Sequence, residues 1–169
     1  MQRSFLMTLA AAFVAALSLQ AQTANPLITE LKQSYTNTKN KFQKLADKMP
    51  DENYGFKATA DIRTFGAVVA HIADAQLRTC SGITGEQKQG TAGTKTAKAE
   101  LVAALKTSFE ECDKAWDSVT DPTQMTTGAR PRTKLGALAG NTVHTEEEYG
   151  YLSVYLRLKG IVPPSSEGR

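Results

Sequence analysis

Residues 133–159 read TKLGALAGNTVHTEEEYGYLSVYLRLK, a stretch with helical periodicity from one end to the other. Thr133 can cap the start of a helix, Gly160 can end it, and Pro163-Pro164 prevents its continuation. On a helix, one sector of about 100° collects Ala137, Asn141, His144, Glu148, Tyr151, Leu152 and Tyr155. The stretch therefore predicts a long helix that turns this face toward a core.

Three earlier segments show the same spacing, with apolar residues three or four positions apart. The first runs from Asn25 to Met49, with Asn25 as its candidate N-cap, Pro26 at the first helical position and Pro50 as its stop. The second begins at the candidate cap Thr64 and reaches about Thr79, and the third spans about Thr96 to Val119. Neither an alternating strand pattern nor an internal repeat is present, so we predict an all-α, four-helix bundle.

Two details of these segments lead to specific expectations. Residues 81–95 are rich in Gly, Thr and charge, which predicts a mobile loop that either shapes access to one end of the bundle or simply connects two helices. Gly150 lies in the middle of the last predicted helix, where glycine costs about 1 kcal/mol relative to alanine. We therefore expect another helix to pack closely against Gly150.

Residues 1–24 have the pattern of a cleavable secretory signal peptide: a basic start, an apolar run from Phe5 to Leu19, and then small and polar residues. The run is shorter than the roughly 20 residues that a membrane-spanning helix needs, so a retained anchor is the weaker interpretation. We expect cleavage between Ala21 and Asn25. Residues 25–169 are then one domain, exported to the periplasm or outside the cell without a stable membrane anchor.

The charges and cysteines narrow the function classes. Removing Arg3 with the signal peptide leaves 19 basic and 17 acidic side chains, a net charge of +2, and the basic residues are scattered. This balance argues against a nucleic-acid partner. Cys80 and Cys112 are the only cysteines, and in an oxidising compartment they either pair or remain two separate thiols. The sequence has no Cys-x-x-Cys-His motif, which excludes c-type haem attachment.

His144 and Glu148 are the candidate metal ligands. Positions i and i+4 of a helix project toward the same partner, and only Glu148 of the acidic run Glu146–Glu148 shares the sector of His144. Glu146 is expected on the outer face. The plain alternative is that the acidic run is solvated surface.

His71, the only other histidine, lies at the margin of the apolar face of the second segment. It is either a residue at the edge of the core or a third ligand. Two imidazoles and one carboxylate suit a divalent transition metal, Zn²⁺, Ni²⁺ or Fe²⁺, and leave positions open for water or substrate. Asp74, one turn beyond His71, is either an acceptor that orients this ligand or an exposed surface residue.

Several short motifs occur along residues 25–169: Met49-Pro-Asp-Glu-Asn-Tyr-Gly-Phe56, Arg63-Thr-Phe-Gly, His71-Ile-Ala-Asp, His144-x-x-x-Glu148-Tyr-Gly and Tyr155-Leu-Arg-Leu-Lys-Gly-Ile-Val-Pro-Pro164. Together they resemble the DinB-like family of damage-inducible four-helix proteins. The resemblance covers essentially all of residues 25–169, and the last motif is its most specific part. It implies a four-helix bundle with a metal held by one histidine of the second helix and a His-x-x-x-His pair of the fourth.

In this chain His71 and His144 match two of the three ligand positions of the family, and Glu148 stands at the third. Either the site still binds an ion, with an altered preference among metals, or the site has been lost. Some relatives look like S-transferases or isomerases that use low-molecular-weight thiols. Those thiols are mainly intracellular, so the signal peptide argues against a simple transfer of that activity. DinB-like bundles often look dimeric, which implies a homodimer, although no heptad marks the partner surface.

Two hypotheses follow. The first is an exported, metal-dependent hydrolase or transferase that acts on a small-molecule substrate and holds its ion with His71, His144 and Glu148. The second is a non-catalytic binding or structural four-helix module that has lost the metal site of its family.

Overall fold

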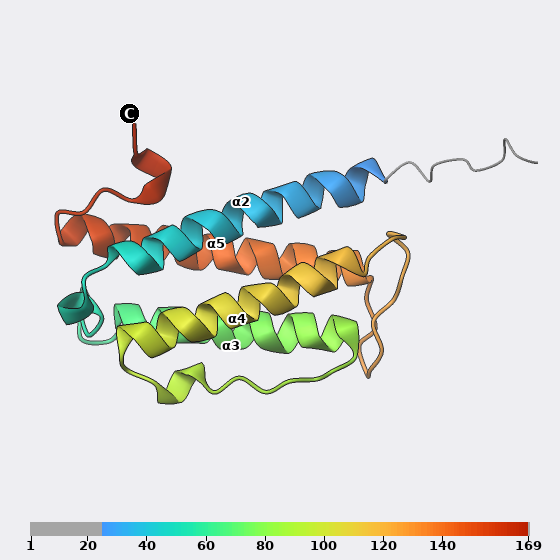
Figure 1. The fold of residues 1–169 in the computed structure, drawn as a ribbon, viewed down its shortest axis with the longest axis horizontal. Coiled ribbons are helices and arrows are strands. Elements are labelled where there is room, and N and C mark those ends of the chain that lie inside the picture. The colour runs from blue at the N-terminus through green and yellow to red at the C-terminus, as the bar shows by residue number, and fades with distance from the viewer. Residues whose placement is uncertain (1–24, 169) are drawn as a thin grey trace, which may run out of the picture.

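The computed structural model describes residues 25–168, which form four α-helices: α2 (Pro26–Lys48), α3 (Phe65–Thr84), α4 (Lys98–Asp117) and α5 (Lys134–Leu158) (Figure 1). Three short 3-10 helices accompany them: η2 (Asp51–Asn53), η3 (Ala92–Thr94) and η4 (Pro164–Ser166). Within residues 25–168 the only β-type pairing is an isolated bridge between Met125 and Thr133. The all-helical prediction is confirmed, whereas the predicted signal peptide lies outside the described residues.

The directions of the helices were not predicted from the sequence. Figure 1 shows that α3 and α4 run the same way, while α2 and α5 run the opposite way. Gly66 near the start of α3 accordingly lies against Leu101 near the start of α4. The connection from α3 to α4 must return along the bundle, so residues 85–97 follow its flank instead of covering one end (Figure 1).

Local signals explain the helix ends. The side chain of Asn25 accepts hydrogen bonds from Leu27 and Ile28, and the hydroxyls of Thr64 and Thr133 cap α3 and α5 in the same way. The predicted end of the second helix near Thr79 is wrong, because α3 continues to Thr84. Ile83 is buried there, and Gly85 ends the helix with a left-handed φ of 89°.

The core lies between all four helices. Its largest fully buried side chains include Trp116, Phe42, Phe65, Phe109, Leu45, Met49 and Ile72. The ring of Tyr35 on α2 stacks on Trp116 of α4 at 5.5 Å, and its hydroxyl hydrogen-bonds with Asp113 at 2.8 Å. None of the helices within residues 25–168 is long and apolar enough to cross a membrane.

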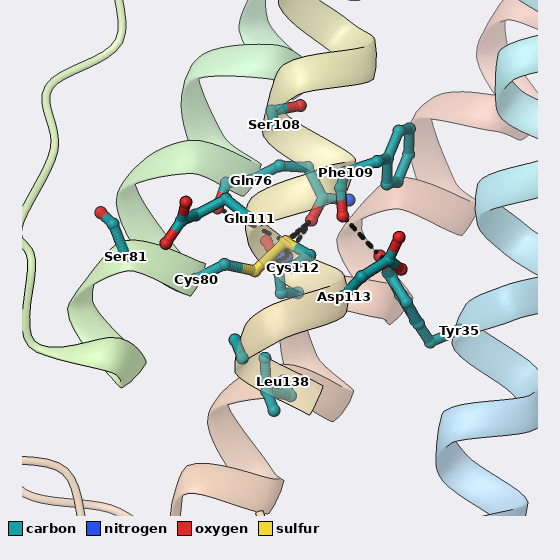
Figure 2. Close-up of a disulfide and its surroundings, with 12 residues drawn as sticks. Tyr35, Gln76, Cys80, Ser81, Ser108, Phe109, Glu111, Cys112, Asp113 and Leu138 are labelled. Atoms are coloured by element: carbon teal, nitrogen blue, oxygen red, sulfur yellow. Dashed lines mark hydrogen bonds between the residues drawn. A yellow bond between two sulfur atoms is a disulfide. The ribbon is translucent and has the colours of Figure 1, made fainter. Parts of the chain in front are cut away.

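Cys80 of α3 and Cys112 of α4 form a disulfide in the middle of this core (Figure 2). Both residues are fully buried, and their Cα atoms lie 4.8 Å apart, within the range that a disulfide spans. Of the two alternatives left open by the sequence, pairing is therefore the one observed. The bond fastens the two parallel helices to each other.

Gly150 is exposed on α5, and a Cβ placed there meets nothing within 4 Å. The expected close packing is therefore wrong. We expect Gly150→Ala to raise the free energy of unfolding by about 0.5–1 kcal/mol, because alanine loses less backbone entropy in a helix. Urea denaturation measures this change.

Gly85→Ala is the matched control, since its left-handed φ disfavours a side chain and the variant is expected to be less stable. A loss of stability in Gly150→Ala would contradict the expectation and would indicate that another molecule packs on this face of α5.

Candidate metal centre

His71 of α3 and His144 and Glu148 of α5 come together at one point between the two helices. The two Nε2 atoms lie 3.2 Å apart, and Glu148 Oε1 lies 4.0 Å from His71 Nε2 and 3.7 Å from His144 Nε2. Two ligand atoms that each bind an ion at about 2.0–2.2 Å are at most about 4.4 Å apart. The three atoms therefore fit around a single cation. The sequence predicted each residue, and the structure places all three together.

A buried polar network beside this cluster sets the register between α3 and α5. Gln76 donates to the hydroxyl of Thr145 at 2.7 Å, and Asn141 donates to the side-chain oxygen of Gln76. Thr145 in turn donates to the carbonyl of Asn141 at 3.0 Å. Satisfied buried hydrogen bonds of this kind favour one alignment of two helices over its alternatives. They hold His71 opposite His144.

Gln76 and Thr145 were not among the residues predicted to form or position the site. Both are buried polar side chains on otherwise apolar faces. That is the signal that would have revealed them.

The environment disfavours charge on two of the three cluster residues. The pKa of His71 is lowered, first by partial burial and then by the positive charges of Arg63, His144 and Arg78, with Asp74 opposing. Burial raises the pKa of Glu148, although His144 and Arg63 pull it down. The side chain of Glu148 is only 12% exposed, compared with 34% for each histidine. A cation at this point would offset the cost of burying the carboxylate.

The two imidazoles also have an interaction without any cation. Their rings are nearly perpendicular, with an interplanar angle of 87° and centroids 5.0 Å apart. The distance of 3.2 Å between the Nε2 atoms allows one neutral ring to donate a hydrogen bond to the other. The same geometry therefore suits a metal-free histidine pair.

A cavity of about 410 Å³ adjoins the cluster. It is lined by Asp61, Ile62, Arg63, Val68, Glu148, Tyr151 and Tyr155. Glu148 belongs to both the cluster and the cavity wall, so a molecule in the cavity can approach the candidate centre. The hydroxyl of Tyr155 donates to the carbonyl of Arg63 at 2.7 Å and ties the segment before α3 to α5.

Two predictions about neighbouring side chains are wrong. Tyr151, placed in the inward sector of the last helix, is 56% exposed and faces the cavity, while Tyr149 is buried instead. Glu146, expected on the outer face, lies against α2, where it pairs with Lys41 and accepts a hydrogen bond from Thr38. A helix that packs against two others buries a wider face than one apolar sector indicates.

Asp74 also has a role that differs from both of its predicted alternatives. Its carboxylate accepts hydrogen bonds from the backbone N–H groups of Ala92 and Gly93 at 2.8 and 2.9 Å. Gly90 packs so closely that an added Cβ would lie 2.1 Å from Asp74 Oδ1. Asp74 thus holds the connection between α3 and α4 against the bundle.

The fold and the cluster together define a four-helix bundle protein with a candidate two-histidine, one-carboxylate metal centre between its helices. The chain belongs to the DinB superfamily, whose family model matches residues 34–152. No curated protein is similar enough to count as a match.

Solved structures share this fold. A DinB-like protein from Bacillus cereus ATCC 10987 is 21% identical, with a TM-score of 0.67, over 79% of this chain and 93% of that protein. The DinB-like protein YjoA from Bacillus subtilis is 20% identical, with a TM-score of 0.64, over 80% of this chain and 93% of that protein. A mycothiol-dependent maleylpyruvate isomerase is 16% identical, with a TM-score of 0.57, over 82% of this chain and 70% of the isomerase.

Proposed function

We propose that this protein is an exported, metal-dependent hydrolase or transferase of the DinB superfamily that acts on a small-molecule substrate. His71, His144 and Glu148 would hold one divalent transition metal, Zn²⁺, Ni²⁺ or Fe²⁺. The observation that carries the proposal is the convergence of three ligand atoms within 4.8 Å of one another at the wall of a cavity. A set of three protein ligands that leaves positions open is typical of catalytic sites.

Such an ion supplies Lewis acidity, which lowers the pKa of a bound water or polarises an oxygen of the substrate. The chain's own contribution is orientation and partial exclusion of water. The network of Gln76, Asn141 and Thr145 aligns the two histidine-bearing helices, and Glu148 brings the centre to the cavity. The lowered pKa of His71 keeps its imidazole neutral and able to bind an ion near pH 7.

Export is supported by two independent features. Residues 1–24 have the composition of a signal peptide, and the Cys80–Cys112 disulfide suits an oxidising compartment. A mycothiol-dependent maleylpyruvate isomerase shares the fold, but its low-molecular-weight thiol belongs mainly inside cells. We therefore propose hydrolysis or group transfer without such a thiol.

A second candidate function has its own supporting observation. Because the two histidines lie at hydrogen-bonding distance from each other, the cluster is also satisfied without an ion. A non-catalytic binding or structural module with a paired-histidine remnant of the metal site is consistent with that geometry.

Metal content separates the two candidates. Protein purified without a histidine tag and incubated with Zn²⁺, Ni²⁺ or Fe²⁺ is expected to retain about one equivalent after gel filtration, measured by elemental analysis. Less than about a tenth of an equivalent of every metal would refute the metal-dependent enzyme and favour the module.

Glu148→Gln is expected to act in opposite directions with and without metal. Loss of a ligand should weaken metal affinity at least about 100-fold, more than loss of an outer partner. Without metal, the variant should be as stable as the wild type or more stable at pH 7, because an amide avoids the burial of a charge. A carboxyl group whose pKa is higher in the folded than in the unfolded protein contributes stability at pH values below its ordinary pKa of 4.5. That contribution is lost as the pH rises through the pKa of the folded state.

The advantage of the amide should therefore shrink as the pH is lowered toward 4.5, which urea denaturation of metal-free protein at several pH values measures. Glu147→Gln is the matched control, since Glu147 is exposed and its ligand atoms are not part of the cluster. Equal metal affinity of the two variants would contradict the assignment of Glu148.

A further inference from the structure

We infer that the cavity beside the cluster binds a small monocarboxylate with an apolar body, whose carboxylate is held by Arg63 and whose body lies against Tyr151 and Val68. This inference names a substrate class for the proposed function. It rests on that function in one respect, namely that the cavity serves the metal centre. The binding itself depends on the cavity residues alone.

Arg63 is the cation of this cavity. Its side chain is exposed, and within residues 25–168 it forms no ion pair. Its main chain, in contrast, is fixed, because the hydroxyl of Tyr155 donates to its carbonyl. An arginine on an anchored backbone at a cavity edge suits the fork-like recognition of a carboxylate.

The remaining wall is largely apolar and aromatic. Val68 and Tyr155 are buried, and the ring of Tyr155 packs edge-on against Phe56 with centroids 5.8 Å apart. Tyr151 and Ile62 are large side chains that remain 56% and 39% exposed. Apolar and aromatic side chains combined with a small number of charged groups, here Asp61, Arg63 and Glu148, are the usual lining of a site for a small organic ligand.

Size and charge narrow the ligand. A volume of about 410 Å³ lies near the lower end of ligand pockets, which suits a single ring or a short chain. Asp61 and Glu148 also line the cavity, so the single cation Arg63 faces two acidic groups. Each negative charge on a ligand is repelled by these two carboxylates, so a ligand with one carboxylate is favoured over a ligand with two. Dianions and phosphate esters fit this arrangement less well.

The test uses benzoate, with benzamide and benzylamine as its neutral and cationic analogues. Each is titrated into Zn²⁺-loaded and chelator-treated wild-type protein while amide NMR signals are followed. Benzoate is expected to shift the signals of Val68, Glu148 and Tyr151, and to bind about three- to tenfold more tightly than benzamide. Arg63→Gln should abolish this preference. Arg130→Gln, which removes the same charge from an exposed loop between α4 and α5, should leave it intact.

Equal binding of benzoate and benzamide, tighter binding of benzylamine, or a benzoate preference that survives in Arg63→Gln would overturn the inference. If the protein binds no metal and chelator-treated protein still prefers benzoate through Arg63, the proposed function fails and the inference stands. If metal binds at the cluster without any benzoate preference, the inference fails and the proposed function stands.

Discussion

Replacing Cys80 and Cys112 together by alanine is expected to lower the free energy of unfolding by about 4 kcal/mol. The two cysteines are 32 residues apart in the sequence, so their bond removes much of the freedom of the unfolded chain. Both are fully buried between parallel helices α3 and α4, which makes the loss of packing an additional cost. Urea denaturation near pH 7 without reductant measures the change.

Adding a reductant separates the contribution of the disulfide bond to the free energy of unfolding from the contribution of the packing of the sulfur atoms. It should destabilise the wild type once the buried bond is reduced, and it should leave the double alanine variant unaffected. A loss of less than about 1 kcal/mol in the variant would mean that the disulfide does not hold α3 and α4 together as described.

His71→Ala and His144→Ala are each expected to remove most of the stabilisation that metal confers. A ligand that binds only the folded protein, at 100 times its dissociation constant, raises the free energy of unfolding by about 2.7 kcal/mol. For a domain of this size the melting temperature should rise by roughly 5–10 °C in the wild type and hardly at all in either variant. Thermal unfolding with and without Zn²⁺ or Ni²⁺ measures the difference.

Asp74→Asn is the matched control for the histidine variants. Asp74 lies one turn from His71, but its carboxylate holds the backbone of Ala92 and Gly93. The variant should be less stable both with and without metal, but metal should raise its melting temperature by as much as it raises that of the wild type. If metal raised the melting temperature of both histidine variants as much as that of the wild type, the proposed metal centre would be ruled out.

The helices could be predicted because their signals lie within a few residues of one another. Asn25, Thr64 and Thr133 cap the helices that they were predicted to cap. The end of α3 was misplaced because Ile83 is buried by residues distant in the sequence, which extends the helix to Gly85.

The candidate site was predictable in part for the same reason. His144 and Glu148 are one helical turn apart, so their shared direction follows from local geometry alone. That His71 meets them depends on the packing of α3 against α5 and on the register that Gln76 and Thr145 set. The cavity was not predictable, because its wall combines Arg63 and Val68 around the start of α3 with Tyr151 of α5, two segments that are far apart in the sequence.

Within residues 25–168, the sequence by itself determined the number of helices, most of their ends and the i, i+4 pair of candidate ligands, because these depend on interactions within one or two turns. Only the tertiary structure decided that α3 and α4 run in parallel, that Cys80 pairs with Cys112, and that the cavity adjoins Glu148. These features depend on how distant helix faces fill a common core. That packing is a property of the whole chain and of no single segment.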